Sequence, residues 1–371
     1  MRRAHSGLRV ALDYLPATTH WPGVGRYARE LTRALVRLPP AELAGIELVL
    51  FEWGSDPRVI GEPWIGLAGF EARVRRVNVV LPRRALEWRA YAGFDAAWSC
   101  GPLDLFHRIH AHYPPLRKVR QLLPVPELRA DPRLRARCAA MAGLLVASAH
   151  AAQRLTGELG VAPERIHHVS TGCEHWAREQ REPIARREPA QVLVLGALRS
   201  GRGHAALLEA FARLAARGRA ARLLFVGPDG IEREPLFARA AALGVRESVE
   251  WIGHAIEEQM PRVMAESAAL AHVSDGELTP VTPLEAFASG TAVLASPLPA
   301  FQEALGDAAT WAPAEAVADA GALAALLERA IESGLDARAA EARRAIAARF
   351  TWAEHARKTV AAWRRVAADP T

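Results

Sequence analysis

Residues 274–296 read SDGELTPVTPLEAFASGTAVLAS, and this stretch decides the fold. The residues just before it, 269–273, form a short apolar run that predicts a buried strand. Within the stretch, residues 283–288 have the composition of a helix, and residues 292–295 form a second apolar run. A strand, a helix and another strand in this order predict a parallel βαβ unit, with helices on both faces of its sheet.

The same alternation extends in both directions from this unit. The second half of the chain predicts further strands at residues 192–195, 222–226 and 249–252, and helices at residues 205–217, 236–243 and 260–267. The first half predicts strands at residues 8–15, 46–53, 74–81, 95–99, 119–125, 144–147 and 166–169, with helices such as 25–38 and 149–159 between several of them. We therefore expect two doubly wound sheets, with ligands beyond the carboxyl ends of their strands.

A charged segment separates the two alternating regions. Residues 177–190 carry two prolines and lack an apolar period, which indicates a linker. We therefore expect a Rossmann-like domain over residues 1–176, a second one over residues 191–350, and a C-terminal helix over residues 351–371. A length of 371 residues suits two domains.

The composition is that of a folded protein, with 50% hydrophobic and 24% charged residues. No apolar run reaches the roughly 18 to 20 residues that span a bilayer. Residues 1–10 lack the apolar core of a signal peptide, so we expect a cytoplasmic protein. The cysteines Cys100, Cys138 and Cys173 match neither a disulfide framework nor a zinc site, and we expect them to be buried.

Charge is distributed unevenly along the chain. Residues 1–180 hold 25 Lys and Arg against 17 Asp and Glu, a net charge of +8, whereas residues 181–371 have a net charge of −2. A basic first half favours an anionic partner such as a membrane surface, and no nucleic-acid recognition motif is evident. Residues 73–91 interleave arginines with Trp88 and Tyr91, which fits an anionic membrane or an ordinary solvated basic face.

Two glutamates in the opening stretch carry the strongest functional signal. Glu277 is expected in the loop after a strand, and Glu285 lies eight residues later in the first turns of the helix. Carboxylates accept hydrogen bonds from vicinal hydroxyls, so two of them can hold a sugar and a ribose. Backbone N–H groups at the helix N-terminus suit a diphosphate. The alternative is a glutamate pair that only caps a solvated helix end.

A glycine-rich and basic loop follows the first strand of the second half, at residues 195–204, LGALRSGRGH. Gly196 lets the backbone approach a ligand closely, and Arg199 and Arg202 can neutralise a phosphate. Gly227 ends the next strand in a similar way. An exposed turn with two arginines is the alternative interpretation.

A related loop follows the first strand of the chain, at residues 22–31, PGVGRYAREL. Gly23 and Gly25 permit close approach, and Arg26 follows at the start of a helix whose N-terminus faces the expected ligand edge. The loop lacks the third glycine of a dinucleotide fingerprint, so a nicotinamide site is the weaker interpretation.

Together these segments resemble the retaining GT-B glycosyltransferases of family 4, also called group 1, which include bacterial mannosyl- and glucosyltransferases of cell-surface polysaccharide synthesis. That family carries a Glu-x7-Glu motif followed by Ala-Ser-Gly-Thr-Pro-Val, and here Glu277, Glu285 and residues 288–293 match it. Thr351 and Trp352 are similar to the family's Phe-Ser-Trp, which precedes a final helix that crosses back to the first domain. The resemblance implies an α/β GT-B fold, in which two Rossmann-like domains face a cleft.

The resemblance also implies roles for single residues. Glu285 would bind the nucleotide ribose and Glu277 the transferred sugar. Arg202, at a position usually held by Lys, and Arg199 would neutralise the donor diphosphate. The remaining implied site residues are Gly196, Leu278, Thr279 and Gly227 at the donor, and Gly23, Gly25 and Arg26 in the cleft loop.

This chain departs from the family at two places. Residues 278–280, Leu-Thr-Pro, replace the family's Gly-Phe-Gly, and Pro280 has no N–H to offer a ligand. Residues 121–126, QLLPVP, replace a His-Asp pair whose histidine reaches the sugar. Three histidines lie upstream in a stretch expected to be a loop, either as substitutes or as solvated side chains: His107, His110 and His112.

The resemblance implies retaining transfer of a hexose, such as mannose or glucose, from a nucleoside diphosphate sugar to a glycan or lipid-linked acceptor. Neither a metal nor another cofactor is expected, and nucleic acid is not an expected partner. Such a protein would act in the cytoplasm, peripherally on the inner face of the plasma membrane. The departures leave two alternatives: a catalytically impaired homologue that binds a partner or glycan, and an epimerase or phosphorylase on the same fold.

Overall fold

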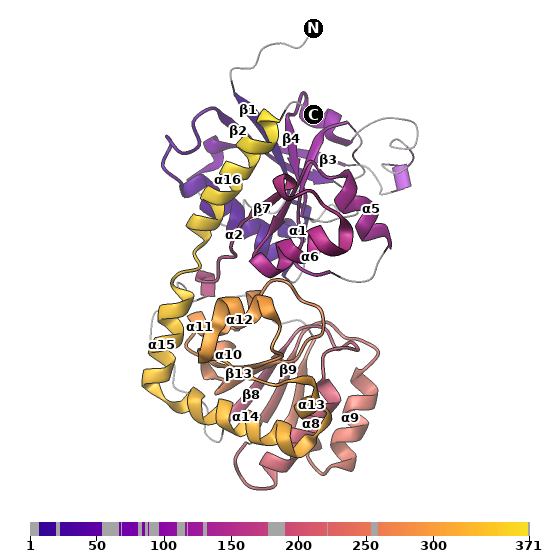
Figure 1. The fold of residues 1–371 in the computed structure, drawn as a ribbon, viewed down its shortest axis with the longest axis vertical. Helices are drawn as coiled ribbons and strands as arrows, with labels where there is room; N and C mark the ends of the chain where they lie inside the picture. The colour runs from indigo at the N-terminus through magenta and orange to yellow at the C-terminus, as the bar shows by residue number, and fades with distance from the viewer. Residues whose placement is uncertain are drawn as a thin grey trace. The chain divides into compact units, whose positions relative to one another are not determined.

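The computed structural model describes residues 7–19, 23–53, 67, 69–80, 84–85, 88, 96–109, 116, 118–128, 132–176, 190–220, 222–253 and 259–369. The chain divides into two compact units (Figure 1). The first unit comprises Met1–Ser170 and Trp352–Thr371, and the second comprises Thr171–Thr351. The expected linker, residues 177–190, lies outside the described residues apart from Ala190. Residues 171–176 belong to the second unit because Cys173 and Trp176 are buried in its core.

The first unit contains a parallel sheet in the order β3-β2-β1-β4-β5-β6-β7. From β1 the chain moves outward to β3 and then returns to place β4 on the other side of β1, which is a doubly wound topology. The strands are β1 (Leu8–Asp13), β2 (Ile46–Trp53), β3 (Val74–Val79), β4 (Leu105–His107), β5 (Arg120–Pro124), β6 (Gly143–Val146) and β7 (Ile166–His168).

The side chains of β1 explain why both faces of this sheet are covered. Val10 and Leu12 join one apolar cluster, and Ala11, between them, joins Phe51 and Phe106 in a second cluster. Successive side chains of a strand point to opposite faces, so each face needs its own layer. The α-helices of this unit are α1 (Leu15–Thr18), α2 (Val24–Arg37), α5 (Pro132–Ala140), α6 (Ala149–Leu159) and α16 (Trp352–Ala368).

The C-terminal helix α16 is part of the first unit and packs against α2 (Figure 1). Its Trp363 is fully buried, and the indole Nε1 donates to Nδ1 of His107 at 3.0 Å. At the start of the same helix, His355 Nδ1 donates to the carbonyl of Ser170 at 2.7 Å. An indole only donates and a carbonyl only accepts, so these two contacts fix the tautomers of both neutral imidazoles.

Tyr27 of α2 connects the two histidines. Its hydroxyl lies 3.2 Å from Nε2 of His355 and 3.5 Å from Nε2 of His107. Burial, together with the nearby His355, lowers the pKa of His107 to about 3. Burial also lowers the pKa of His355 to about 4, against the hydrogen bond to Ser170. Both imidazoles of the network that holds α16 in place, those of His107 and His355, are therefore neutral at neutral pH.

The second unit contains a parallel sheet in the order β10-β9-β8-β11-β12-β13. The strands are β8 (Gln191–Leu195), β9 (Arg222–Val226), β10 (Val249–Ile252), β11 (Ala269–His272), β12 (Ala292–Ala295) and β13 (Thr310–Trp311). The α-helices are α8 (His204–Ala215), α9 (Arg233–Ala242), α10 (Met260–Glu266), α11 (Val281–Ala288), α12 (Pro299–Leu305), α13 (Ala314–Ala318), α14 (Ala320–Leu335) and α15 (Ala337–Ala347). The doubly wound α/β class predicted for both sheets is confirmed.

One strand prediction is wrong. Residues 95–99 were expected as a strand, but Ala96–Cys100 form a 3-10 helix in which Trp98 is half exposed. The strand at this point in the sheet is β4, whose three side chains are fully buried. A strand of three residues with a histidine in it gives a weak apolar signal, so the sequence did not reveal it. Consequently His107 lies in a buried strand, and its expected position in a loop is wrong.

The predicted state of the cysteines is confirmed. Cys100, Cys138 and Cys173 are all free and buried. Burial raises the pKa of the Cys173 thiol, and the carboxylates of Glu174 and Glu285 raise it further. A buried protonated thiol behaves as a small apolar side chain.

Candidate functional site

Two loops of the second unit meet beyond the carboxyl ends of β8 and β11. The loop from β8 to α8 carries Arg202, and the loop from β11 to α11 carries Glu277. The Arg202 guanidinium forms an ion pair with Oε1 of Glu277. Both side chains are partly accessible, with 16% and 14% of their surface exposed. The structure thus brings together two of the residues that the sequence predicted for the donor site.

Glu277 has a second partner that the sequence did not suggest. His272, the last residue of β11, places Nε2 3.0 Å from Oε2 of Glu277. Burial raises the pKa of this carboxyl, but His272, Arg202 and the Ser274 hydroxyl together outweigh burial and hold the pKa at about 2. Glu277 is therefore an ionised acceptor at neutral pH, fixed by two donors on opposite oxygens.

Glycines allow the two loops to lie this close. A Cβ on Gly203, whose φ is +61°, would stand 2.7 Å from Cγ1 of Val273. A Cβ on Gly201, whose φ is +80°, would stand 2.6 Å from a carboxylate oxygen of Asp275. Both positions combine a left-handed backbone with a close neighbour, so a side chain at either one would strain the loop that carries Arg202.

The two predicted strand-end glycines also serve close packing. A Cβ on Gly227 would lie 2.3 Å from the carbonyl oxygen of Gly196. The N–H of Gly196 donates to Val226 at 2.8 Å, and the N–H of Gly227 donates to Ile252 at 3.0 Å. These glycines extend the hydrogen bonding of the sheet into the loops and bring the loop after β9 against the loop after β8.

Glu285 lies deeper than Glu277. It belongs to α11 and is fully buried, and its Oε1 is 3.2 Å from Nε2 of His175. His175 follows Cys173 in the segment that begins the second unit. The sequence predicted Glu285 within the first helical turns, which is confirmed, but it gave no sign of the histidine that lies against it.

The other predicted donor residues lie in the same two loops. The side chain of Leu278 is buried. Thr279 precedes Pro280, which is the N-cap residue of α11, and the Thr279 carbonyl accepts from the N–H of Val281 at 3.0 Å. Arg199 is half-buried in the loop after β8. The functional roles of these residues stay predictions.

A small pocket opens between these strand ends. It is lined by residues of β8, β11 and the loops that follow them, Arg202 and His204 among them. His204 is the first residue of α8, and its Nδ1 lies 2.8 Å from Oε2 of Glu232. Burial lowers the pKa of His204, although Glu232 opposes this. The imidazole of His204, held by Glu232, therefore adds no positive charge to the pocket that it shares with Arg202.

In the first unit the predicted loop residues lie at the start of α2. Gly23 has a φ of +73° and is the N-cap of α2. A Cβ on Gly25 would stand 2.4 Å from the carbonyl oxygen of Pro16, so this glycine lets α2 pack on α1. Arg26 lies in the first turn of α2 and is partly exposed. His107 belongs to the core network, and His110 and His112 lie outside the described residues.

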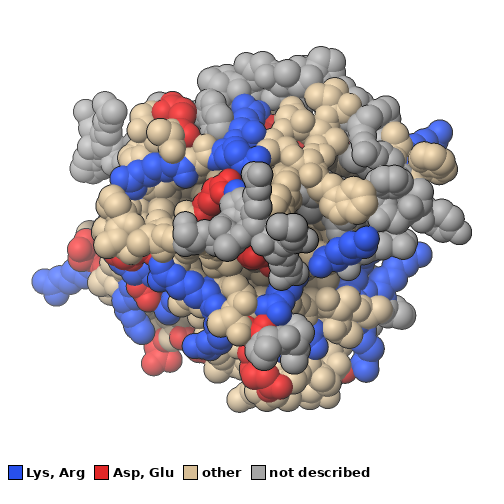
Figure 2. Space-filling view, turned by 90° about the horizontal axis from the view of Figure 1, so that it is seen from above, with Lys and Arg blue, Asp and Glu red and all other residues tan. Residues whose placement is uncertain are grey.

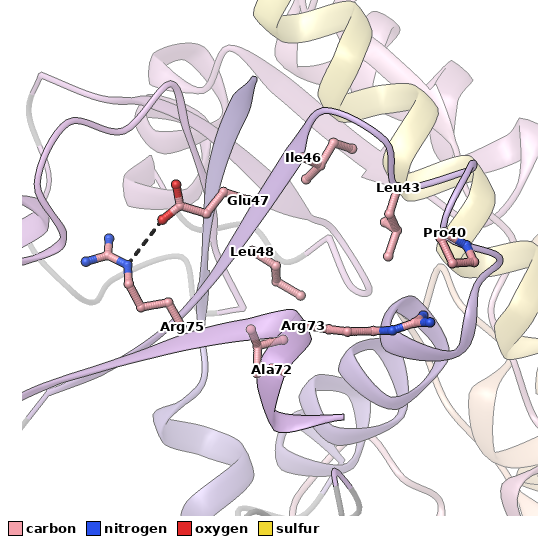
Figure 3. A pocket seen from close by; sticks show the side chains of 9 residues that line it. Pro40, Leu43, Ile46, Glu47, Leu48, Ala72, Arg73 and Arg75 are labelled. Atoms are coloured by element: carbon pink, nitrogen blue, oxygen red, sulfur yellow. Dashed lines mark ion pairs between the residues drawn. The ribbon is translucent and has the colours of Figure 1, made fainter. Parts of the chain in front are cut away.

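A larger groove in the first unit lies elsewhere. It has a volume of about 470 Å³ and is lined by residues that begin β2 and β3, at the amino ends of the strands (Figure 3). Its charged side chains already have partners. Arg73 donates to the carbonyls of Val36 and Leu38 at 2.7 and 3.1 Å, and Arg75 pairs with Glu47 at 3.3 Å. These contacts stabilise the sheet and α2 rather than leaving charges for a ligand.

Within the described residues, no group of three or more His, Cys, Asp or Glu side chains could hold a metal ion. That the reaction needs no metal stays a prediction.

Comparisons with known proteins agree with this architecture. The family described as glycosyl transferases group 1 matches residues 177–349. The MMP alpha-(1->4)-mannosyltransferase of Mycolicibacterium hassiacum is 30% identical over 232 residues, which are 61% of this chain. That match covers 54% of the mannosyltransferase, about half its length.

Solved structures share the fold. The sucrose-phosphate synthase of Thermosynechococcus elongatus matches with a TM-score of 0.71 and 17% identity, over 96% of this chain and 98% of that one. HepE of Anabaena, solved with UDP and glucose, matches with a TM-score of 0.66 and 15% identity over the same shares of the two chains.

These comparisons define the fold and indicate what the second unit resembles. The two parallel α/β sheets and the solved neighbours make this a GT-B protein. Its second unit is similar to the group 1 glycosyltransferases over residues 177–349. In the described part of the chain, no helix has the length and apolar composition needed to cross a membrane.

Proposed function

We propose that this protein transfers a hexose from a nucleoside diphosphate sugar to an acceptor hydroxyl, with retention at the anomeric carbon. The observation that carries the proposal is the meeting of Arg202 and Glu277 at the strand ends of a unit similar to the group 1 glycosyltransferases. A guanidinium suits a diphosphate, and an ionised carboxylate suits sugar hydroxyls.

The proposed reaction needs no enzyme nucleophile. The bond between the anomeric carbon and the diphosphate oxygen breaks, and the acceptor oxygen bonds to that carbon on the same face. The leaving diphosphate takes the acceptor's proton. Arg202 and Arg199 would neutralise the charge that develops on the diphosphate, because donors aimed at developing charge lower the barrier. Glu277 would hold the transferred sugar and Glu285 the ribose.

The identities of donor and acceptor rest on the named relatives. The mannosyltransferase suggests mannose, and the UDP and glucose in HepE suggest a uridine nucleotide and glucose. A glycan or a lipid-linked sugar is the proposed acceptor, since these carry the free hydroxyl that transfer requires. Neither a metal nor another cofactor enters the proposed reaction.

Thermal unfolding provides the first test. A ligand of the folded state raises the melting temperature by mass action. We expect one of UDP, GDP, ADP and dTDP to do so, with and without Mg²⁺, and the corresponding sugar nucleotide to support transfer in EDTA. NMR of the product would report the anomeric configuration. If no nucleotide binds and no sugar is transferred, the chain is instead a binding or scaffold homologue.

The proposed setting is an anionic membrane that carries the acceptor. The described part of the basic stretch includes Arg75 and Trp88, and the Trp88 side chain is 71% exposed. Lys118 lies over the exposed ring of Trp98, 5.4 Å from its centre. Figure 2 shows Lys and Arg side chains spread over one face, with Asp and Glu among them. Cosedimentation with phosphatidylglycerol vesicles at low salt tests this, and no binding would favour an ordinary basic surface.

A further inference from the structure

The two oxygens of Glu277 are held in different ways. Oε2 lies 3.0 Å from Nε2 of His272, and His272 is buried at the end of a strand. Oε1 pairs with Arg202, which belongs to a loop and is partly exposed. The carboxylate only accepts hydrogen bonds, so Nε2 of His272 carries the hydrogen. One oxygen is therefore anchored to the sheet, and the other has a partner that a ligand can reach.

Arg202 has capacity for a further anion. Among the described residues its buried Nε atom has no hydrogen-bond partner, 16% of the side-chain surface is exposed, and a guanidinium offers five N–H groups in all. An anion that binds this guanidinium would, however, come close to the Glu277 carboxylate. Two negative charges at such a distance repel, so an incoming diphosphate weakens the bond between Glu277 and Arg202.

We propose that the Arg202–Glu277 ion pair is a latch opened by the donor diphosphate, and that His272 is a positioning residue that keeps Glu277 in place when the latch opens. This inference rests on the proposed function. With Oε2 still held by His272, Oε1 turns from Arg202 to a hydroxyl of the transferred sugar. A sugar nucleotide replaces both partners of the ion pair, whereas a nucleoside diphosphate replaces only one. The latch thus favours the intact donor over the spent nucleotide.

Glu277→Gln tests the latch. The amide keeps the shape and removes the charge that competes for Arg202. We expect the nucleoside diphosphate that stabilises the wild-type protein, among UDP, GDP, ADP and dTDP, to bind about threefold to fivefold more tightly to this variant, the effect of a partly exposed ion pair. Titration calorimetry measures it. Unchanged or weaker binding would overturn the latch.

His272→Ala tests the positioning role. We expect kcat to fall about 10- to 100-fold, the cost of losing a hydrogen bond to a charged group, while the nucleoside diphosphate Kd stays within about threefold. His272→Gln retains an N–H donor and should recover part of kcat. Equal losses in the two variants, or a Kd that rises as much as kcat falls, would contradict the role. His167→Gln, at a buried histidine of the first unit, is the matched control.

The outcomes separate this inference from the function beneath it. A wild-type protein that neither binds a nucleotide nor transfers a sugar refutes both. A wild-type protein that transfers sugar, beside Glu277→Gln and His272→Ala variants that behave like it, refutes only the latch and the positioning role.

Discussion

The two sheets end their strands in polar side chains of opposite character. In the second unit, Arg202 and Glu277 remain partly exposed and charged. In the first unit, Asp13 at the end of β1 is buried, and burial raises its pKa to about 7 against the pull of Arg108. Two sheets of the same topology therefore differ at their strand ends. The second carries accessible charges, and the first carries a buried carboxyl that is about half protonated at neutral pH.

The charged neighbours of the two carboxyls, more than how deeply each is buried, explain why their pKa values differ. Glu277 and Asp13 are both carboxyls beyond strand ends, and burial raises the pKa of each. Glu277 has His272 and Arg202 within contact, so its pKa falls to about 2. Favourable charges thus determine which carboxyl is kept ionised and available for a ligand.

The largest expected effect concerns the buried network of the first unit. Trp363→Ala removes a fully buried indole together with its hydrogen bond to His107. Such truncations cost roughly 3 to 5 kcal/mol of unfolding free energy. Urea unfolding would measure it, and nucleotide binding by the second unit should persist. A loss below about 1 kcal/mol would show that α16 adds little to this core.

Acidification should affect the same network. His355 has a folded pKa of about 4 and an ordinary pKa of 6.5, so below pH 6.5 the unfolded state takes up a proton that the folded state refuses. His355 therefore contributes a fall in the free energy of unfolding of about 1.4 kcal/mol per pH unit between pH 6.5 and 4, roughly 3 kcal/mol in all, and His107, with a pKa of about 3, adds to it in the same sense. Asp13 titrates in the opposite sense, so His355→Gln is the required comparison. Its shallower slope is the expected result, and parallel slopes would contradict it.

In the second unit the expected losses concern activity. Arg202→Ala should lower kcat by about 100-fold or more, because it removes a cation aimed at developing negative charge. Arg219→Ala, which removes an exposed arginine paired with Glu328 and Glu332, is the matched control. Equal kcat values for the two variants would rule out the assigned role of Arg202.

The smallest expected effect is at Glu285. If this carboxylate binds the ribose, Glu285→Gln should weaken nucleotide binding about tenfold, or about 1.4 kcal/mol. Calorimetry measures the change, and circular dichroism checks that the buried contact with His175 survives. An unchanged Kd would make Glu285 a purely structural residue of α11.

The sequence predicted the second unit well because its signals are local. The expected strands at residues 222–226, 249–252 and 292–295 coincide with β9, β10 and β12. Arg202 and Glu277 were both singled out, although their contact depends on glycines that bring two loops together. His272 was missed because a histidine that ends an apolar strand has no distinguishing pattern, and only the path of the following loop turns Glu277 back onto it.

The first unit was harder to predict because its decisive contacts are distant in sequence. His107 and Trp363 are 256 residues apart, and no periodicity links them. Strand β4 has three residues, too few for an alternating pattern to emerge. The roles of Gly23 and Gly25 in a ligand loop stay predictions, and the structure gives Gly25 a packing partner in Pro16.

Because helix α16 completes the first unit, the two units should complete their folding in a different order from their synthesis on the ribosome. The second unit is one continuous segment that ends at Thr351, so all of it is made before α16. The first unit starts earlier yet must wait for Trp363 to emerge, and until then the apolar faces that receive this helix lack their cover. Domains generally fold as they emerge, so the later-made unit should complete folding first. The earlier-made unit is then the one whose apolar surface stays exposed for longer.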